Sequence, residues 1–315
     1  MMSSLSRRRF LNGGVSALGA ASLTRALAPL GALAASDASA ITVIPLTPKD
    51  GGGLTLLQGS GCNVVVLPGP DGALMIDGGL AAHSGALLKA VSGATGTHRI
   101  ATLINTHWHP EQTGSNEAVG VGGGLIIAHE VTRLYEGRKA YSVCFEGTYG
   151  PLPAKARATK TTRTSGSLEF AGQHIDYDYL PAAHTDGDLY IHFPALNLLV
   201  TGGPVEGNRW PILDIHNGGW LGGLVRAYEK LATIVKPDTR VVPASGKVLT
   251  GADIIRYRDI YQRLFKQMFV FFNHGYGPSD AAAARPLKDH EEELGDASVF
   301  VAGAYRSLLQ AYVPD

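Results

Sequence analysis

Residues 105–114 of the chain read Asn-Thr-His-Trp-His-Pro-Glu-Gln-Thr-Gly. The preceding run Ile100–Ile104 is apolar and rich in β-branched residues, which predicts a buried strand. His107 and His109 are two residues apart, so in extended backbone their side chains point to the same side. Pro110 favours that backbone, because a proline disfavours the helical region in the residue before it. Two such imidazoles can bind one metal ion, although solvated histidines at a strand end would give the same pattern.

Two further features favour a metal site. His184 lies in the segment 183–188, Ala-His-Thr-Asp-Gly-Asp, which follows another strand-like run. Glu111 and Gln112 place an acid and an amide just beyond His109. A third imidazole and a carboxylate are therefore available to the same site, if the fold brings these segments together.

With these residues the chain resembles the metallo-β-lactamase fold superfamily, whose fingerprint is His-x-His-x-Asp-His, then a distant His, an Asp and a last His. The resemblance covers about residues 41 to 267. It implies an α+β fold, a four-layer αββα sandwich of two strand-rich halves, each covered by helices. Besides the histidine segments it rests on three stretches: Gly-Pro-Asp-Gly at 69–72, Ile-Asp-Gly-Gly at 76–79 and Pro-Asp-Thr-Arg-Val-Val-Pro at 237–243.

The resemblance also implies a site. His107, His109 and His184 match the ligands of the family's first metal, residue for residue. A catalytic zinc site has three protein ligands and an open position for water, so we expect one zinc ion here. Asp77 and Asp186 are expected to be structural carboxylates that hold the surrounding loops.

The second metal site of the family is not matched. The family's Asp and His of the first motif are Glu111 and Gln112 here, its bridging Asp falls at Gly203, and its final His is Ser245. Neutral amides and hydroxyls bind zinc poorly compared with imidazole or carboxylate, so we expect the second site to be absent. Glu111 is expected to orient or deprotonate the metal-bound water, or to be a fourth ligand. His216 could substitute for a lost ligand.

Three functions fit this pattern. The first is a one-zinc hydrolase acting on a small-molecule ester, lactam, thioester or phosphodiester. The second is a degenerate pseudoenzyme that binds a ligand without catalysis. The third is a site for another metal, such as Fe or Mn, held by the three histidines and Glu111. Trp108 and the aromatic residues of a later insertion would either line an apolar pocket or pack beneath the loop.

The composition of the chain further narrows the classes of protein to which it could belong. The chain has 315 residues, of which 45% are hydrophobic and 17% charged, so a sizeable core is feasible. The formal net charge is +0, which argues against nucleic acid as a partner. Two cysteines do not make a disulfide scaffold. We expect Cys62 to lie in a strand and Cys144 to be free in an irregular segment.

Residues 1–40 are expected to be a cleavable export signal. Ser-Arg-Arg-Arg-Phe-Leu at 6–11 resembles the twin-arginine signal, so the expected partner is the twin-arginine export machinery and the expected location is the periplasm or the medium. That machinery carries folded proteins. A membrane anchor is disfavoured, because Arg25 and Pro29 interrupt the apolar stretch well short of the roughly 20 residues that a span needs. We expect no stable membrane span after signal removal.

Residues 41–315 are expected to form a single domain with a helical C-terminus. A basic insertion at about 137–165 is predicted to be irregular, and would be either a lid over the site or a solvated surface excursion. Hydrophobic spacing predicts strands at 41–46, 54–58, 63–67, 73–76, 100–104, 125–128, 167–170, 174–180, 189–193, 196–200 and 239–242. It predicts helices at 80–91, 114–119, 129–135, 218–234, 251–272 and 297–312.

Overall fold

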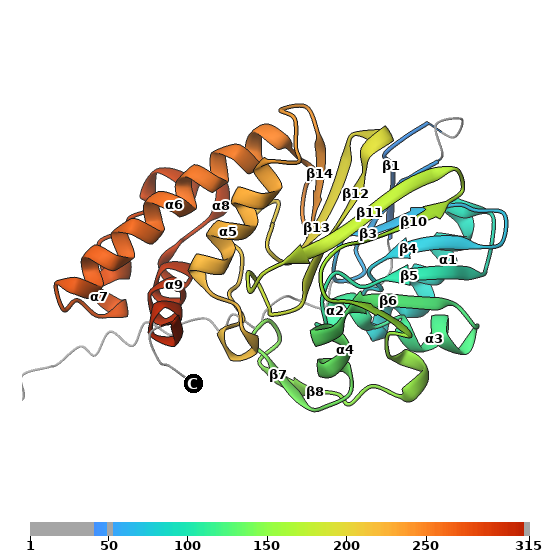
Figure 1. Ribbon diagram of the computed structural model, residues 1–315, viewed down its shortest axis with the longest axis horizontal. Coiled ribbons are helices and arrows are strands. Elements are labelled where there is room, and N and C mark those ends of the chain that lie inside the picture. The colour runs from blue at the N-terminus through green and yellow to red at the C-terminus, as the bar shows by residue number, and fades with distance from the viewer. Residues whose placement is uncertain (1–40, 49–52, 312–315) are drawn as a thin grey trace, which may run out of the picture.

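A computed structural model describes residues 41–48 and 53–311 of the chain. Two β-sheets lie face to face, and each is covered on its outer side by helices (Figure 1). The predicted α+β four-layer sandwich is therefore confirmed. The predicted export signal, residues 1–40, lies outside the described residues.

The first sheet has the strand order β1-β2-β3-β4-β5-β6-β9 (Figure 1). The neighbours from β1 to β4 pair antiparallel, whereas β4, β5, β6 and β9 pair parallel. Parallel neighbours need a crossover, which α1 and α3 provide. The bounds are β1 Thr42–Pro45, β2 Thr55–Gln58, β3 Val64–Leu67, β4 Ala73–Ile76, α1 Ser84–Thr95, β5 Ile100–Ile104, α2 Pro110–Thr113, α3 Asn116–Val121, β6 Leu125–His129, α4 Glu130–Glu136 and β9 Lys160–Thr162.

The second sheet has the order β10-β11-β12-β13-β14-β15. Its pairs are antiparallel except for β13 and β14, which are parallel and joined through α5. The C-terminal helices cover its outer face and extend beyond it (Figure 1). The bounds are β10 Gly166–Phe170, β11 Gln173–Leu180, β12 Asp188–Phe193, β13 Leu198–Gly202, α5 Leu221–Ala232, β14 Arg240–Pro243, β15 Leu249–Thr250, α6 Gly251–Asn273, α7 Pro278–Ala283, α8 Glu291–Leu294 and α9 Ser298–Ala311.

Three hydrophobic clusters separate the four layers. Strand β4 shows how the sequence supplies two of them, because alternate side chains of a strand point to opposite faces. Leu74 and Ile76 pack between the sheets, while Ala73 and Met75 pack on the side of α1. The third cluster lies between the second sheet and α5, α6 and α9, and the apolar stripe predicted for α6 is buried in it. Every residue of β4 is buried, which explains its continuous apolar run.

The two sheets are joined by hydrogen bonds near one end of the sandwich. The Asn63 side chain, just before β3, donates to the carbonyl oxygen of Pro243 at 2.9 Å and to that of Gly246 at 3.1 Å. The backbone of Asn63 also donates to Ala244 at 2.7 Å. The loops that follow β4 and β5 therefore lie next to the loops that follow β13 and β14. Ligands in open α/β sheets bind at the carboxyl ends of such strands.

The insertion is more ordered than the sequence predicts. Residues 140–149 form a two-stranded hairpin, β7 (Ala140–Ser142) and β8 (Gly147–Tyr149), and β9 adds an edge strand to the first sheet. The hairpin strands are three residues long, which is too short for a clear alternating pattern. Helices α2 and α7 were also not predicted, and with four and six residues they are equally short.

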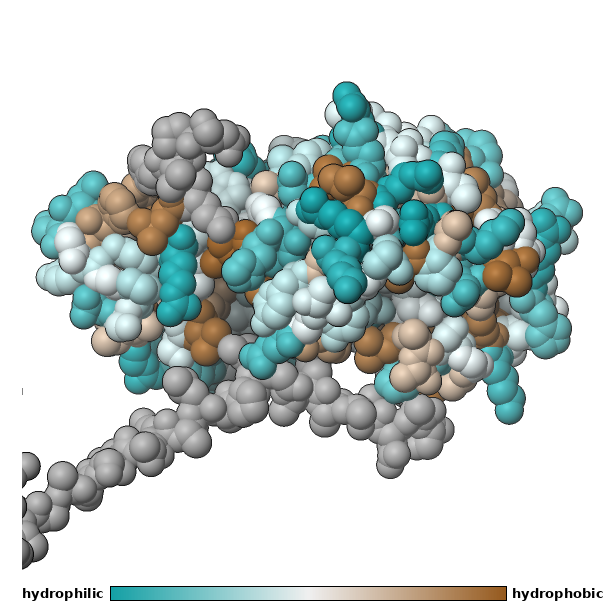
Figure 2. Space-filling model, turned by 90° about the horizontal axis from the view of Figure 1, so that it is seen from below, coloured by the Kyte–Doolittle hydropathy of each residue, from teal (hydrophilic) through white to brown (hydrophobic). Residues whose placement is uncertain are grey.

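Both cysteines are free and buried. Cys144 lies in the turn between β7 and β8, an irregular segment as expected, whereas Cys62 lies in a bend before β3 and not in a strand. Within the described residues no helix combines the length and the apolar character that crossing a membrane requires. On the face shown in Figure 2, hydrophobic residues are scattered among hydrophilic ones and form no continuous belt.

His129 is the N-cap of α4, which agrees with its expected place at a helix entry. Its Nδ1 accepts from the backbone of Val131 at 3.2 Å, and its Nε2 donates to the carbonyl oxygen of Arg163 at 3.0 Å. The ring stacks on Tyr179 with centroids 4.4 Å apart. Burial lowers the pKa of His129, so the folded protein holds the neutral ring.

We expect His129→Ala to lower the free energy of unfolding by about 1–2 kcal/mol near neutral pH, through the lost cap and the lost stacking. A folded pKa below the ordinary value means that this contribution is complete above that value and is lost as the pH falls. Urea denaturation at neutral and mildly acidic pH would measure the gap between variant and wild type. If the difference in free energy of unfolding between His129→Ala and wild type did not narrow in acid, this account would be contradicted. His98→Ala, at an exposed position, is the control.

Candidate metal centre

Three histidines from two loops meet at the end of the sandwich. His107 and His109 follow β5, His184 precedes β12, and all three are buried. Their ring centroids are 4.6 to 4.8 Å apart in every pairing. One nitrogen of each ring lies within 4.8 Å of the others, so the three could hold one metal ion. The structure thus brings together the three predicted ligands.

The hydrogen bonds of His107 assign its tautomer. Its Nδ1 lies 3.1 Å from the hydroxyl of Thr106, and that hydroxyl donates to Asp77 at 2.8 Å. The hydroxyl oxygen is therefore the acceptor, and Nδ1 of His107 carries the proton. Its Nε2 is left as a lone pair, buried and without a partner among the described residues.

The other two rings also turn a lone pair to the centre. Nε2 of His109 donates to the Asp214 carboxylate at 2.8 Å, which leaves Nδ1 as an acceptor. Nδ1 of His184 donates to the carbonyl oxygen of Ile212 at 2.6 Å, which leaves Nε2 as an acceptor. These two acceptor nitrogens are 3.0 Å apart. Two lone pairs at this distance repel each other unless a proton or a metal ion lies between them.

The groups around His109 favour a positive charge at the centre. Burial would lower the pKa of His109, but the neighbouring Cys144, Asp214 and Glu111 raise it well above the ordinary value. Burial and the adjacent imidazoles lower the pKa of His107 well below its usual range and that of His184 to about 4. The cluster is therefore built for one cation and not for three charged rings.

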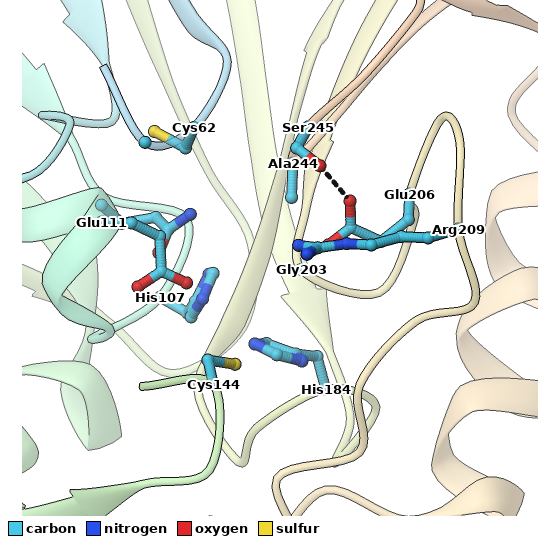
Figure 3. Close-up of a pocket in the computed structure, with 12 residues that line it drawn as sticks. Cys62, His107, Glu111, Cys144, His184, Gly203, Glu206, Arg209, Ala244 and Ser245 are labelled. Carbon is cyan, nitrogen blue, oxygen red and sulfur yellow. Dashed lines mark hydrogen bonds and ion pairs between the residues drawn. The ribbon is translucent and has the colours of Figure 1, made fainter. Parts of the chain in front are cut away.

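A small cavity of about 10 Å³ lies against this cluster, with room for roughly one water molecule or ion. Figure 3 shows Glu111, Cys144 and His184 pointing toward one another, with Arg209 entering from the opposite side. Four residues that line the cavity have a buried polar atom with no partner in the described part of the chain: Nε2 of His107, Oε2 of Glu111, Oε1 of Gln112 and Nε of Arg209. Buried polar atoms in native proteins are nearly always paired, so these atoms indicate a bound ion or water.

Two buried carboxylates hold the ligand loops. Asp77 follows β4 with a φ of 62° and accepts from the backbone of Thr106 at 2.8 Å, as expected for a structural residue. Asp188 accepts from the backbone nitrogens of His184 at 2.7 Å and Thr185 at 2.9 Å. Burial raises the pKa of Asp77 to about 8 and that of Asp188 to about 7, against the hydrogen bonds, which lower both.

Two of the predicted site residues lie elsewhere. The carboxylate of Asp186 accepts from the hydroxyl of Tyr179 at 2.6 Å, and it is Asp188 that holds the His184 loop. His216 is exposed and packs edge-on against Tyr141, with centroids 5.6 Å apart. The predicted substitution of His216 for a lost ligand is wrong, because the 3₁₀ helix Ile215–Asn217 turns its side chain outward.

The positions matched to a second metal are filled differently. A Cβ atom on Gly203 would lie 2.1 Å from Cδ2 of His184, so no side chain fits there with this backbone. Ser245 donates to Glu206 at 2.5 Å, and Glu206 accepts from Arg209 at 2.8 Å (Figure 3). The side of the cavity lined by Glu206 and Arg209 therefore holds a guanidinium–carboxylate pair next to the three histidines.

Trp108 packs beneath the loop and is not among the residues that line the cavity. Its ring stacks on Tyr135 with centroids 5.2 Å apart and meets His109 edge-on. Of the two interpretations given for Trp108, the structure supports packing.

Sequence reasoning missed Asp214, Cys144 and Arg209 as site residues. Sγ of Cys144 lies 3.5 Å from Nδ1 of His109, and burial raises the pKa of the thiol. Asp214 and Arg209 come from the irregular segment between β13 and α5, and no spacing in the sequence marks them. Asp188 could have been found, because it is the second acid of the His-Thr-Asp-Gly-Asp segment and begins β12.

Comparisons with known proteins agree with this geometry. The family model of the metallo-β-lactamase superfamily matches residues 57–260. A metallo-β-lactamase from Pontibacter korlensis is similar in structure, with a TM-score of 0.58, 18% identity and coverage of 71% of this chain and 99% of that one. The DIM-1 metallo-β-lactamase has a TM-score of 0.56 and 14% identity, covering 71% and 97%.

A third similar structure is the stereoselective inverting sec-alkylsulfatase Pisa1 from Pseudomonas sp., with a TM-score of 0.63 and 15% identity. The match covers 87% of this chain but only 50% of the alkylsulfatase. No match was found among curated proteins. At these identities the structures establish a common fold and nothing about substrate.

We expect Asp214→Asn to weaken zinc binding by about 10- to 100-fold, because the ring of His109 loses the carboxylate that orients it. Competition with a chromogenic chelator would measure the affinity. Asp186→Asn is the matched control, because the Asp186 carboxylate accepts a hydrogen bond from Tyr179. The zinc affinity of this variant should be unchanged. Equal losses in the two variants would contradict the orienting role of Asp214.

Proposed function

The chain belongs to the metallo-β-lactamase superfamily, and on that premise we propose that it is a hydrolase with one zinc ion held by His107, His109 and His184. One observation carries the proposal. Two acceptor nitrogens, on His109 and His184, face each other at 3.0 Å, and the buried Nε2 of His107 completes the set without a partner. Three neutral imidazoles are a typical ligand set of catalytic zinc. Bound there, zinc would lower the pKa of its water to about 7 and polarise a carbonyl or phosphoryl oxygen.

We infer a single metal from what surrounds the cavity. Gln112 and Ser245 offer neutral oxygens, which bind zinc poorly, and the backbone at Gly203 leaves no room for a bridging carboxylate. Arg209 brings a fixed positive charge to the same side, where a second cation would be repelled.

Glu111 is the residue best placed to handle the proton. It lies at the start of α2, with Oε1 3.6 Å from Nδ1 of His109 and Oε2 buried and without a partner in the described chain. A carboxylate next to the metal ligands can orient a water, take its proton and later pass that proton to the leaving group. Hydrogen-bond partners for Oε2 would come from that water.

Arg209 suggests the class of substrate. Its side chain is 34% exposed, so its guanidinium lies between solvent and the buried centre. Guanidinium groups bind carboxylate and phosphate oxygens and stabilise negative charge that develops in a reaction. We therefore propose a small ester, lactam, thioester or phosphodiester with an anionic group.

A binding protein without catalysis is the second candidate. The cavity of about 10 Å³ admits an ion or a water but no substrate, so the hydrolase needs the surrounding loops to open. A degenerate protein would need no such opening. In a third arrangement the three histidines and Glu111 hold Fe or Mn. Elemental analysis would distinguish it from the zinc hydrolase.

We also propose that the protein is exported through the twin-arginine machinery and acts in the periplasm or outside the cell. The support is the Arg-Arg pair within residues 6–11. A buried histidine centre fits this route, since its two loops meet only in the folded chain.

We expect protein purified without chelator to contain about one zinc per chain by elemental analysis. His107→Ala and His184→Ala should each lose the metal, because two imidazoles do not replace three. One equivalent of iron or manganese would favour the third arrangement. Two zinc ions per chain would contradict the inference of a single metal. Protein without any bound metal would contradict the proposal that it is a hydrolase.

We expect Glu111→Gln to keep the metal and to lower the turnover of a substrate found by screening by about 100- to 10,000-fold, because the amide cannot accept the proton. Glu117→Gln, an exposed residue on α3, is the matched control and should keep full activity. Hydrolysis that is unchanged in Glu111→Gln would remove Glu111 from the mechanism. Ligand binding that survives with no hydrolysis in any variant would favour the binding protein.

A further inference from the structure

We propose that Asn217 is a positioning residue that couples the β7–β8 hairpin of the insertion to the metal ligand His109. The inference rests on the metal centre of the proposed function and goes beyond it, because it gives the insertion a part in metal binding. Asn217 ends the 3₁₀ helix Ile215–Asn217 and is only 5% exposed. It acts on His109 through the carboxylate of Asp214.

The side-chain amide of Asn217 bridges two parts of the chain. Its Nδ2 donates to Oδ2 of Asp214 and to the carbonyl oxygen of Tyr141 in β7, both at 2.7 Å. An amide nitrogen carries two protons, so these two bonds use both of them. Both partners are acceptors, which also fixes which end of the amide faces them. One planar group therefore ties a strand of the hairpin to a carboxylate of the metal centre.

The carboxylate of Asp214 is held by two donors. Asp214 is fully buried, and its Oδ2 accepts from Nε2 of His109 at 2.8 Å as well as from Asn217. Its Oδ1 is buried and has no partner in the part of the chain that the structure describes. A group that orients a ligand must itself be held by something other than that ligand. For the side chain of Asp214, Asn217 provides this hold.

The backbone around Asn217 is bonded to the loop of a second ligand. The backbone nitrogen of Asp214 donates to the carbonyl oxygen of His184 at 2.9 Å. The backbone nitrogen of Asp186 donates to the carbonyl oxygen of Asn217 at 2.8 Å. We therefore expect the turn 214–217 to keep its position when the Asn217 side chain is truncated. Truncation then removes the bond to the hairpin and the second donor to Asp214.

The hairpin depends on such contacts for its position. It forms a two-stranded sheet that pairs with no other strand of the described chain, and an isolated hairpin is only marginally stable. Ala140 attaches it to a small hydrophobic cluster with Trp108 and Tyr135. The bond from Asn217 to Tyr141 is a further attachment, and it leads through a contiguous chain of hydrogen bonds to His109. Metal binding and hairpin position are then linked in both directions.

The first test measures the zinc affinity of the full chain by competition with a chromogenic chelator. We expect Asn217→Ala to weaken zinc binding by about 3- to 10-fold, because the carboxylate that orients His109 loses its second donor. In the Asp214→Ala background the same truncation should add less than about a twofold loss, since Asn217 acts through Asp214. An unchanged affinity in Asn217→Ala, or losses that add fully in the double variant, would overturn the positioning role.

Asn63→Ala is the matched control. Asn63 is also a buried amide whose Nδ2 donates two hydrogen bonds, but both acceptors are backbone carbonyl oxygens, those of Pro243 and Gly246. Its truncation should lower the free energy of unfolding and leave the zinc affinity of the folded protein unchanged. Equal losses of affinity in Asn63→Ala and Asn217→Ala would assign the effect to lost stability and contradict the proposal.

Hydrogen exchange read by mass spectrometry tests the coupling from the side of the hairpin. Zinc should slow amide exchange in residues 140–149 of wild type and of Asn63→Ala, relative to the chelator-treated proteins. This protection should be lost in Asn217→Ala. Protection that persists in that variant, or that is absent from zinc-loaded wild type, would rule the coupling out. Wild type that binds no zinc would instead overturn the proposed function, so the two failures are distinct.

Discussion

Every feature of the centre follows from one requirement, that three imidazoles in a dry interior present unprotonated nitrogens to a single point. A histidine can do this only if its other nitrogen donates a hydrogen bond to a fixed acceptor. The structure provides a different acceptor for each ring: the hydroxyl of Thr106, the carboxylate of Asp214 and the carbonyl oxygen of Ile212. These acceptors come from two stretches of chain, around Thr106 and around residues 212–214, so the centre exists only in the folded protein.

The fold meets this requirement by joining two sheets at one end. The loop after β5 carries two histidines and the loop before β12 carries the third. Buried carboxylates then hold each loop, Asp77 through Thr106 and Asp188 through the backbone of His184. A buried carboxylate loses its hydration, and only several short hydrogen bonds offset that loss. Asp188 accepts three of them, which fixes the loop more firmly than a single contact would.

Charged groups lie on two sides of the cavity. Glu111, Asp214 and Cys144 lie next to His109 and favour a positive charge at the centre. Arg209, paired with Glu206, already supplies a positive charge on the other side. The histidine cluster and the Arg209 guanidinium thus place positions that favour positive charge on two sides of the cavity.

The sequence alone determined much of this protein. Strong periodic patterns gave the strands around β4 and β5 and the long helix α6, because each buries a continuous apolar face whatever its neighbours are. The spacing of His107 and His109, the His184 segment and the family resemblance predicted three histidines that the structure brings together, where they could hold a metal ion. The resemblance also predicted the structural role of Asp77, whose carboxylate accepts from Thr106, 29 residues further along the chain.

The tertiary structure decided the rest. Asp214 and Cys144 reach His109 from 105 and 35 residues away along the chain, and Arg209 enters from a segment with no regular pattern. Such contacts depend on how two sheets and a short hairpin pack, which no local spacing encodes. The outward position of His216 and the role of Asp188 in place of Asp186 also depend on how loops without regular spacing fold. Local periodicity specifies elements and ligand pairs, whereas long-range packing specifies which groups complete them.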